Sequence, residues 1–439
     1  MRRRTLALCT LGPLALVAAA CASCTSLLGI DGDYHAGAGD DAGDESDVGA
    51  ASDTTTGDVT PPPDTGADTN QTSVADAGPV VEVTLGKFHS CARFAGGFAR
   101  CWGRSDDYGE FGDGTFSRSA VPVPAMGGGG GILDLFAGSH DTCAVLADGG
   151  ECAGKGGTGE LGNGVGDADL PVPVPTSVLP GVPTAIASGE RFTCAIIPPG
   201  DVYCVGDSSQ GELGNGSYGL SLTAVQVSLQ GKKAVAIAAY YQHACAALAD
   251  GTVACWGDDT FGQLGDGNLT PDAGLAVPVI VSGLPTGSTA MATAVGVGDS
   301  FSCALMGTDV WCWGDNSSGQ LGDGNTNPVA TPQQVVGVSG VGLLAVGGAH
   351  ACAGLLNAGL TKCWGKGGSG QLGNNDTAVA PTPVEVFNLS YPQSLSAGGF
   401  HTCALISSPN VVCWGSNDFG QLGNGDAPNQ QIIPVQVTW

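Results

Sequence analysis

One glycine-rich phrase, close to Trp-Gly-Asp-x-x-x-Gly-Gln-Leu-Gly-Asp-Gly, occurs seven times between residues 102 and 425. Each copy follows a pair of cysteines that lie nine to eleven positions apart. The first cysteines of successive pairs are separated by 52, 51, 51, 58, 49 and 51 residues. A period of this length indicates stacked supersecondary units rather than one irregular core, so it constrains the architecture before any other feature is considered.

Each repeat contains four short apolar runs. The first is rich in valine or alanine and ends in glycine, the second starts at the first cysteine, and the third ends at the second cysteine. The fourth is a proline-valine segment after the phrase, such as Val277-Pro278-Val279. Helical periodicity is absent, and the 74 glycines oppose helices. Four strands in each of seven units predict an all-β fold, a seven-bladed β-propeller of four-stranded blades, over residues 79–439.

The chain has 17 cysteines, of which fourteen form one pair in each repeat. In the fourth pair, two apolar runs flank Asp250-Gly251, which predicts a hairpin that places Cys245 opposite Cys255. We expect a Cα separation of about 5.5 Å there, which suits a disulfide. Zinc ligation is the weaker alternative, because no CxxC spacing occurs and a lone cysteine pair without a regular histidine partner makes a poor zinc site. The predicted disulfides, which imply an oxidising, extracytoplasmic compartment, are Cys91–Cys101, Cys143–Cys152, Cys194–Cys204, Cys245–Cys255, Cys303–Cys312, Cys352–Cys363 and Cys403–Cys413.

The N-terminus has the pattern of an export signal. Three arginines follow Met1, an apolar stretch runs from Leu6 to Val17, and three alanines precede Cys21. Residues 1–20 therefore predict a signal peptide, and the small residues before Cys21 resemble a bacterial lipobox in which this cysteine is acylated. Cys24 is a poorer candidate, and secretion without a lipid is the alternative. No later stretch is long and apolar enough for a transmembrane helix, so we expect a cell-envelope protein anchored by lipid, or else a secreted one.

Residues 21–78 predict a disordered, acidic linker. From residue 25 to 78 the chain is mostly Asp, Ala, Gly, Thr and Pro, with twelve acidic residues and no Lys or Arg. Such a segment cannot bury enough apolar surface to offset the entropy of ordering. With the twelve linker acids and the three N-terminal arginines set aside, the 41 acidic and 14 basic residues of the chain leave 29 acidic against 11 basic in the repeat region.

The repeat resembles that of the regulator of chromosome condensation family. That family's unit reads roughly Ala-Gly-x-x-His-x-Cys-Ala-Leu, then Val-x-Cys-Trp-Gly, then Gly-Gln-Leu-Gly, and the last repeat follows it closely at residues 398–405, 412–415 and 420–423. The resemblance covers about residues 80–439 and implies the propeller fold. Repeats two and three depart from the pattern, because Ala153 and Val205 occupy the tryptophan position.

We interpret the recurring residues of the phrase as structural. Its glycines permit positive φ, its Gln can bind the loop's own amides, and its Leu and the Trp can fill the seams between blades. A phosphate cradle is the alternative, but no lysine follows at the required spacing. Histidines stand two residues before the first cysteine at His89, His243, His350 and His401. His140 lies one place earlier in the second repeat, and Phe192 and Phe301 take the histidine position in the third and fifth. This substitution favours a packed ring with one hydrogen bond over a metal site.

Several functions are disfavoured by charge and composition. The resemblance implies guanine-nucleotide exchange on chromatin for the family's best-known member, but an excess of about eighteen negative charges repels nucleic acid. No catalytic order of residues stands out, although a hydrolase or lyase built on a propeller stays an alternative, as does a purely structural or adhesive envelope protein. We expect no enzyme, no cofactor, no bound metal and a monomer, while calcium at the acidic turns stays open.

A rigid binding platform is the remaining interpretation. Secreted bacterial members similar to the beta-lactamase inhibitory proteins clamp a partner protein with one face, which is a precedent by analogy for such a platform. The residues that break the repeat are the candidates for a partner face, because exposed Tyr and Arg are typical hot-spot residues. The sequence predicts Arg191, Tyr240 and Tyr241 on such a face, with a protein or cell-wall ligand as the partner.

Overall fold

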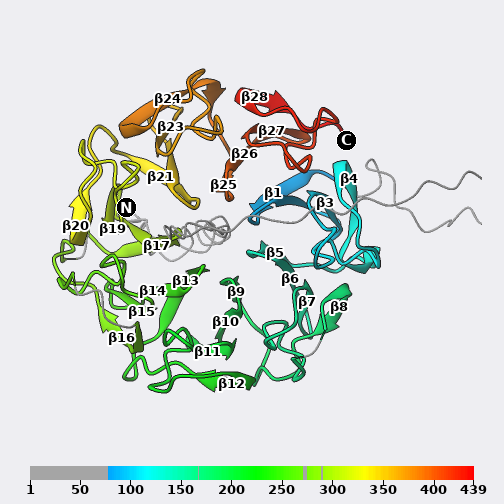
Figure 1. The fold of residues 1–439 in the computed structure, drawn as a ribbon, viewed down its shortest axis with the longest axis vertical. Coiled ribbons are helices and arrows are strands. Elements are labelled where there is room, and N and C mark those ends of the chain that lie inside the picture. Colours follow the sequence, from blue (N-terminus) through cyan, green and yellow to red (C-terminus); the bar gives the residue numbers. More distant parts are fainter. Residues whose placement is uncertain (1–77, 167, 270–273, 288–289) are drawn as a thin grey trace, which may run out of the picture.

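Seven four-stranded antiparallel sheets are arranged in a ring (Figure 1). The computed structural model describes residues 78–166, 168–269, 274–287 and 290–439. Every sheet is built from four consecutive strands, so each blade corresponds to one sequence repeat. The predicted seven-bladed propeller is confirmed. The predicted signal peptide with Cys21, and all of the linker except Gly78, lie outside the described residues.

The strands of each blade are numbered in chain order. Blade one has β1 Val80–Leu85, β2 His89–Phe94, β3 Ala99–Gly103 and β4 Ser119–Ala125, followed by the short 3-10 helix η2 Met126–Gly128. Blades two and three have β5 Asp134–Ala137, β6 Asp141–Leu146, β7 Gly149–Gly154, β8 Leu170–Pro175, β9 Ala185–Ser188, β10 Phe192–Ile197, β11 Asp201–Gly206 and β12 Ser221–Gln226. Blades four and five have β13 Ala234–Tyr240, β14 His243–Leu248, β15 Val253–Gly257, β16 Leu275–Ile280, β17 Ala292–Val297, β18 Phe301–Met306, β19 Asp309–Gly314 and β20 Val329–Gln334. Blades six and seven have β21 Val341–Val346, β22 His350–Leu355, β23 Leu360–Gly365, β24 Ala380–Ser390, β25 Ser394–Ala397, β26 His401–Ser407, β27 Asn410–Gly415 and β28 Gln431–Gln436.

The first strand of each blade lies nearest the centre of the ring and the fourth lies at the rim (Figure 1). Inner strands are almost wholly buried, as in β17 and β25, whereas outer strands such as β8 and β12 consist of exposed and half-buried residues. The apolar core therefore lies within and between the blades. In the described part of the chain, no helix is long and apolar enough to cross a bilayer.

Each blade carries one disulfide between its second and third strands, as predicted from the cysteine spacing. Cys245 pairs directly with Cys255 in the β14–β15 register, and the other six pairs are equivalent. The Cα separation is 4.0–4.1 Å, so the expected value of about 5.5 Å is wrong. The reason is register: Leu248 N–H donates to the Thr252 carbonyl at 2.8 Å, which places the cysteines three steps away at a non-hydrogen-bonded position, where strands approach more closely. Seven disulfides indicate an oxidising environment.

The ring closes without exchange of a strand between the first and last blades, because β1–β4 and β25–β28 each form a complete sheet. The two blades are joined by side chains instead. The Val80 N–H donates to Ser408 Oγ at 2.7 Å, and the C-terminal Trp439 packs edge-on against Phe94 and Trp102. Closure therefore depends on the same kind of packing that joins the other blades.

Two kinds of loop share one side of the ring, which we call the loop face. One is the inner turn between the first and second strands, and the other is the glycine-rich phrase between the third and fourth. In blade one the Arg104 N–H donates to the Phe88 carbonyl at 2.9 Å, which ties the phrase to the inner turn, and the equivalent bond recurs in all seven blades. The opposite side, the hairpin face, carries the turns between the second and third strands.

Candidate functional site

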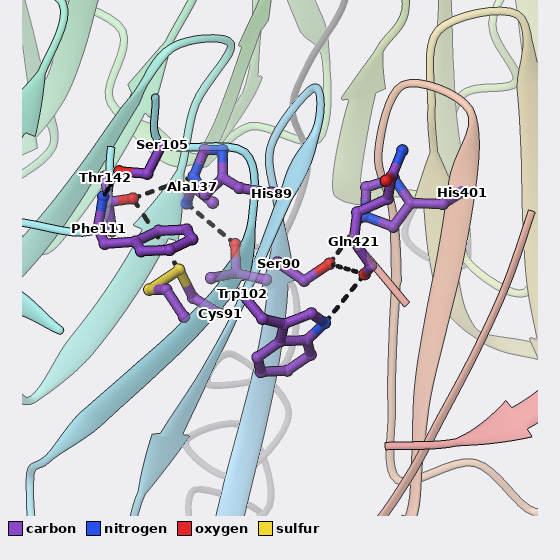
Figure 2. The surroundings of a disulfide bond; sticks show 12 residues. His89, Ser90, Cys91, Trp102, Ser105, Phe111, Ala137, Thr142, His401 and Gln421 are labelled. Carbon is purple, nitrogen blue, oxygen red and sulfur yellow. Dashed lines mark hydrogen bonds between the residues drawn. A yellow bond between two sulfur atoms is a disulfide. The ribbon is translucent and has the colours of Figure 1, made fainter. Parts of the chain in front are cut away.

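The seams between blades use the glycine-rich phrase of one repeat and the tryptophan of the next. Where the seam between blades seven and one closes the ring, Trp102 Nε1 donates to the Gln421 carbonyl at 2.9 Å (Figure 2). The same bond forms from Trp256, Trp313, Trp364 and Trp414 to the preceding phrase. The Gln side chain binds its own loop, as when Gln421 Oε1 accepts the Phe419 N–H at 2.9 Å. Both predicted roles of the phrase are confirmed.

Glycine is required where the tryptophan lies against the phrase. Gly423 has a φ of 66°, and a Cβ atom placed on it would lie 2.7 Å from Trp102 Nε1. Any side chain at this position would therefore push the tryptophan out of the seam. Repeats two and three, which have Ala153 and Val205 in place of tryptophan, form seams without this bond.

Glutamate replaces the phrase glutamine in the first three blades. Glu110 and Glu212 are buried, and burial raises the pKa of Glu110 to about 8 and that of Glu212 to about 7. Glu212 Oε2 accepts the Gln210 N–H at 2.8 Å, the bond that the glutamines make in later blades. A carboxyl group whose neutral form is favoured by burial therefore substitutes for the amide in these seams.

The histidine side chains that the sequence predicts to be packed lie in the same seams. His401 Nε2 lies 2.8 Å from Ser90 Oγ of the next blade, and this hydroxyl donates to the Gln421 carbonyl at 2.8 Å (Figure 2). His89, His243 and His350 make the equivalent contact with a hydroxyl of the blade that follows. The four histidines are buried, and burial lowers the pKa of each to about 3, so they are neutral. The expected hydrogen bond from each packed imidazole is confirmed.

Two seams replace this polar pair with an apolar one. Phe192 and Phe301 stand at the histidine position, and the hydroxyl position of the blade that follows is then alanine, Ala244 and Ala351 respectively. The two positions thus change together. The hydroxyl already donates its proton to the phrase carbonyl, so beside phenylalanine its oxygen would be a buried acceptor that lacks the histidine N–H as donor. The residue directly before each first cysteine carries this signal, and our sequence reasoning missed it.

Acid should destabilise the histidine seams. Between the ordinary histidine pKa of about 6.5 and the folded value of about 3, the unfolded chain binds more protons, so stability falls as pH decreases. We expect the double variant His243→Phe, Ser302→Ala, which copies the Phe301–Ala351 pair, to gain on the wild type by about 1.4 kcal/mol per pH unit below pH 6.5. Denaturant unfolding at pH 7, 6, 5 and 4 measures this difference. The buried carboxyl groups shift stability in the opposite direction but are common to both proteins, and a difference independent of pH would contradict the assignment.

Charged side chains converge at the centre of the loop face. Lys87, Glu190 and Asp299 come from the inner turns of blades one, three and five and interact electrostatically across the ring. Burial lowers the pKa of Lys87 to about 7, although both carboxylates act to raise it. Burial likewise raises the pKa of Asp299 to about 7 against the influence of Lys87 and Lys366. Lys87 and Asp299 therefore both titrate near neutrality, because each lies in a poorly solvated environment.

Beside this centre lies an aromatic–cation cluster, which consists of Phe88, Arg104, Lys366, Phe400 and Phe419. The Phe88 ring lies 6.0 Å from Phe400 and 5.1 Å from Phe419, measured between ring centroids. Arg104 lies over both Phe88 and Phe419, at 5.3 and 5.1 Å, and Lys366 lies 5.2 Å from Phe400. All five side chains are half-buried, so each retains surface that a ligand can contact. A cleft of about 360 Å³ adjoins Phe419 and is also lined by Arg118 and Asp418.

Residues 166–439, more than half of the chain, match the RCC1-like domain family. The chain belongs to this family. It is 29% identical to the Arabidopsis thaliana ultraviolet-B receptor UVR8 over 342 residues, which cover 76% of each protein. It is also 29% identical to the human E3 ubiquitin-protein ligase HERC2 over 278 residues, 61% of this chain but only 6% of that protein. The chain therefore spans a small part of HERC2.

Solved structures show the same RCC1-like fold. Yeast RCC1 (Prp20) bound to Kap60 superposes with a TM-score of 0.68 at 18% identity, covering 82% of this chain and 84% of that one. Human WBSCR16 gives a TM-score of 0.65 at 20% identity, covering 76% and 87%. At this level of identity the likeness concerns the fold alone.

The RCC1-like propeller brings two of the three predicted partner-face residues together. Arg191 and Tyr241 lie in the inner turns of blades three and four on the loop face, where the Tyr241 carbonyl accepts the Glu190 N–H at 2.9 Å. The Arg191 side chain is half exposed, with its Nε 3.9 Å from Asp207 Oδ2. Tyr241 is half-buried and has a φ of 45°.

The prediction that Tyr240 contacts a partner is wrong, because its side chain is fully buried. It ends the inner strand β13 at a position where the other six blades have glycine, namely Gly86, Gly138, Gly189, Gly298, Gly347 and Gly398. The sequence marked Tyr240 as a break in the repeat but could not tell an exposed break from one that fills the core. In the part of the chain that the structure describes, no group of three His, Cys, Asp or Glu side chains is placed to hold a metal ion.

Proposed function

We propose that this RCC1-like propeller is a non-enzymatic, extracytoplasmic scaffold whose loop face binds a partner protein. The aromatic–cation cluster carries the proposal. Aromatic rings and arginine dominate binding energy at protein interfaces, and a cluster of both on a rigid frame is already ordered before the partner arrives. Yeast RCC1 has been solved bound to Kap60, and yeast Prp20p is described with binding properties toward Gsp1p and histones, so the fold is used to hold proteins.

The proposal extends to the arrangement of the whole chain. Residues 1–20 act as an export signal, Cys21 carries a lipid, and residues 21–78 hold the propeller of residues 79–439 away from the membrane as a monomer. The repeat region has 29 acidic and 11 basic residues, and this negative charge supports a protein or cell-wall partner and disfavours nucleic acid. Radiolabelled lipid precursor incorporated into the wild type but not into Cys21→Ala tests the anchor separately from binding.

Site-specific photo-crosslinking tests the loop face. A photoreactive phenylalanine analogue replaces Phe419 in the full-length exported chain, and the matched control carries it at Tyr391, which is 68% exposed on the hairpin face. We expect one cross-linked protein from the Phe419 position and none from the control. Equal cross-linking at both positions would indicate adhesion without a defined face, the structural alternative.

Truncation of side chains in the aromatic–cation cluster should weaken binding of the partner that cross-linking identifies. We expect Arg104→Ala with Phe419→Ala to reduce its affinity by at least about thirtyfold, since a hot-spot residue contributes about 2 kcal/mol or more. Tyr391→Ala is expected to change nothing, and the melting temperature of each variant shows whether the fold is retained. Unchanged affinity in a folded double variant would exclude the cluster as the binding site.

A further inference from the structure

Six of the seven outer strands carry proline at one equivalent position. This position directly precedes the residue that pairs with the blade's second cysteine, as in β16, where Val279 pairs with Cys255 and follows Pro278. The other five prolines are Pro122, Pro173, Pro332, Pro383 and Pro434. In β12, Val225 pairs with Cys204 and the preceding residue is Ala224. The strand Ser221–Gln226 contains no proline at all.

The backbone N–H at this position points away from the blade. The Val227 N–H donates inward to the Val202 carbonyl at 2.9 Å, so residues of the same parity face β11 and the alternate residues Ala224 and Gln226 face outward. Proline removes the outward donor, which is how edge strands avoid pairing with another chain. Among the outer strands that the structure describes, β12 alone keeps that donor.

Exposed apolar side chains surround this edge. Tyr218, Leu220 and Leu222 are exposed just before and within β12, and Val165 is exposed on the neighbouring blade. Tyr218 is held in place, because its hydroxyl donates to the Gly274 carbonyl at 2.9 Å. No charged residue occurs between Leu213 and Gly231. An added strand would therefore find the outward N–H of Ala224 and an apolar border, with charge only at the far end of β12, where Gln226 Nε2 donates to Asp201 Oδ1 at 3.2 Å.

We propose that β12 accepts an extended segment of a cationic partner protein as a fifth strand of blade three. Strand addition supplies main-chain hydrogen bonds, and the apolar border selects alternate apolar side chains. The partner is cationic because the propeller carries 29 acidic against 11 basic residues, so basic flanks are attracted to the surface while the uncharged edge takes the paired residues. A second copy of this chain would bring the same negative charge and is repelled. This site lies on the rim and is independent of the loop-face proposal.

A synthetic peptide tests the edge. The probe is a fluorescent decapeptide, Lys-Lys-Thr-Val-Thr-Val-Thr-Val-Lys-Lys, added to the oxidised full-length chain and followed by anisotropy and by hydrogen exchange. We expect saturable binding that slows amide exchange within residues 221–226. Ala224→Pro copies the other six blades and is expected to weaken binding at least about tenfold, and Thr223→Lys should do so by charge repulsion. The matched gain-of-function variant, Pro278→Ala, should create a second peptide site on blade four.

The outcomes separate the alternatives. Loss of binding in Ala224→Pro and Thr223→Lys with unchanged melting temperatures supports the proposal. Absence of peptide binding to the wild type, binding unaffected by both variants, or protection outside residues 221–226 would overturn it. A dimer in light scattering that Ala224→Pro converts to a monomer would also overturn it, because the occupant would then be a second copy. Photo-crosslinking at Phe419 is unaffected by any of these results, so the two proposals fail separately.

Discussion

Replacing Trp102 with alanine is expected to lower the free energy of unfolding by about 3–5 kcal/mol, the usual cost of truncating a fully buried aromatic side chain. The change removes the bond to the Gln421 carbonyl and the edge-on contact with Trp439, both of which join the first blade to the last. Every other seam joins blades that are also consecutive in the chain. This seam has no covalent support, so its loss should open the ring.

A tryptophan outside the seams supplies the control. Trp311 lies on β19 and is half-buried, so Trp311→Ala removes the same side chain from the edge of the core. We expect it to cost less than half as much. Urea unfolding measures both variants, and hydrogen exchange locates the effect: amides of β1–β2 and β25–β26 should exchange faster in Trp102→Ala only. Uniform acceleration over all seven blades would mean that the ring fails as a unit and not at its closure.

The fold could be predicted because its determinants are local and repeated. Cys245 and Cys255 flank a two-residue turn signal, so the hairpin and its disulfide are visible within eleven residues. Seven copies of that signal leave little freedom for the rest of the chain. Only the Cα separation was misjudged, since a sequence does not say which cross-strand pairs are hydrogen-bonded.

The sites were harder to predict because they depend on contacts between repeats. The co-substituted Phe192 and Ala244 are 52 positions apart, and the pairing emerges only when the repeats are compared position by position. The aromatic–cation cluster unites Phe88 with Phe400 and Phe419 across the ring closure, which no local pattern indicates. Tyr240 was misjudged for the opposite reason, since a departure from a repeat marks a change in packing as readily as a contact surface.

Reduction of the seven disulfides is expected to abolish the folded state. Each closes a loop of nine to eleven residues, for which the chain-entropy model gives about 2.5 kcal/mol of stabilisation. Seven such contributions, about 18 kcal/mol, exceed the net stability of about 5–15 kcal/mol that is typical of a folded protein. A chain denatured, reduced and returned to native buffer with reductant should therefore stay without its sheet signal in far-UV circular dichroism.

The same argument predicts how reduction proceeds from the native side. All fourteen disulfide-bonded cysteines are at most 1% exposed, so reductant should reach them only when a blade opens. Reduction of the native protein should then be slow, limited by unfolding and independent of reductant concentration once reductant is in excess. The matched variant Cys303→Ala with Cys312→Ala removes one bridge and should lower stability by about 2.5 kcal/mol while the other six hold the ring. If alkylation and mass spectrometry found all fourteen thiols free in a chain that still unfolds cooperatively, packing at the seams alone would be sufficient for the propeller, and the expected loss of the fold on reduction would be wrong.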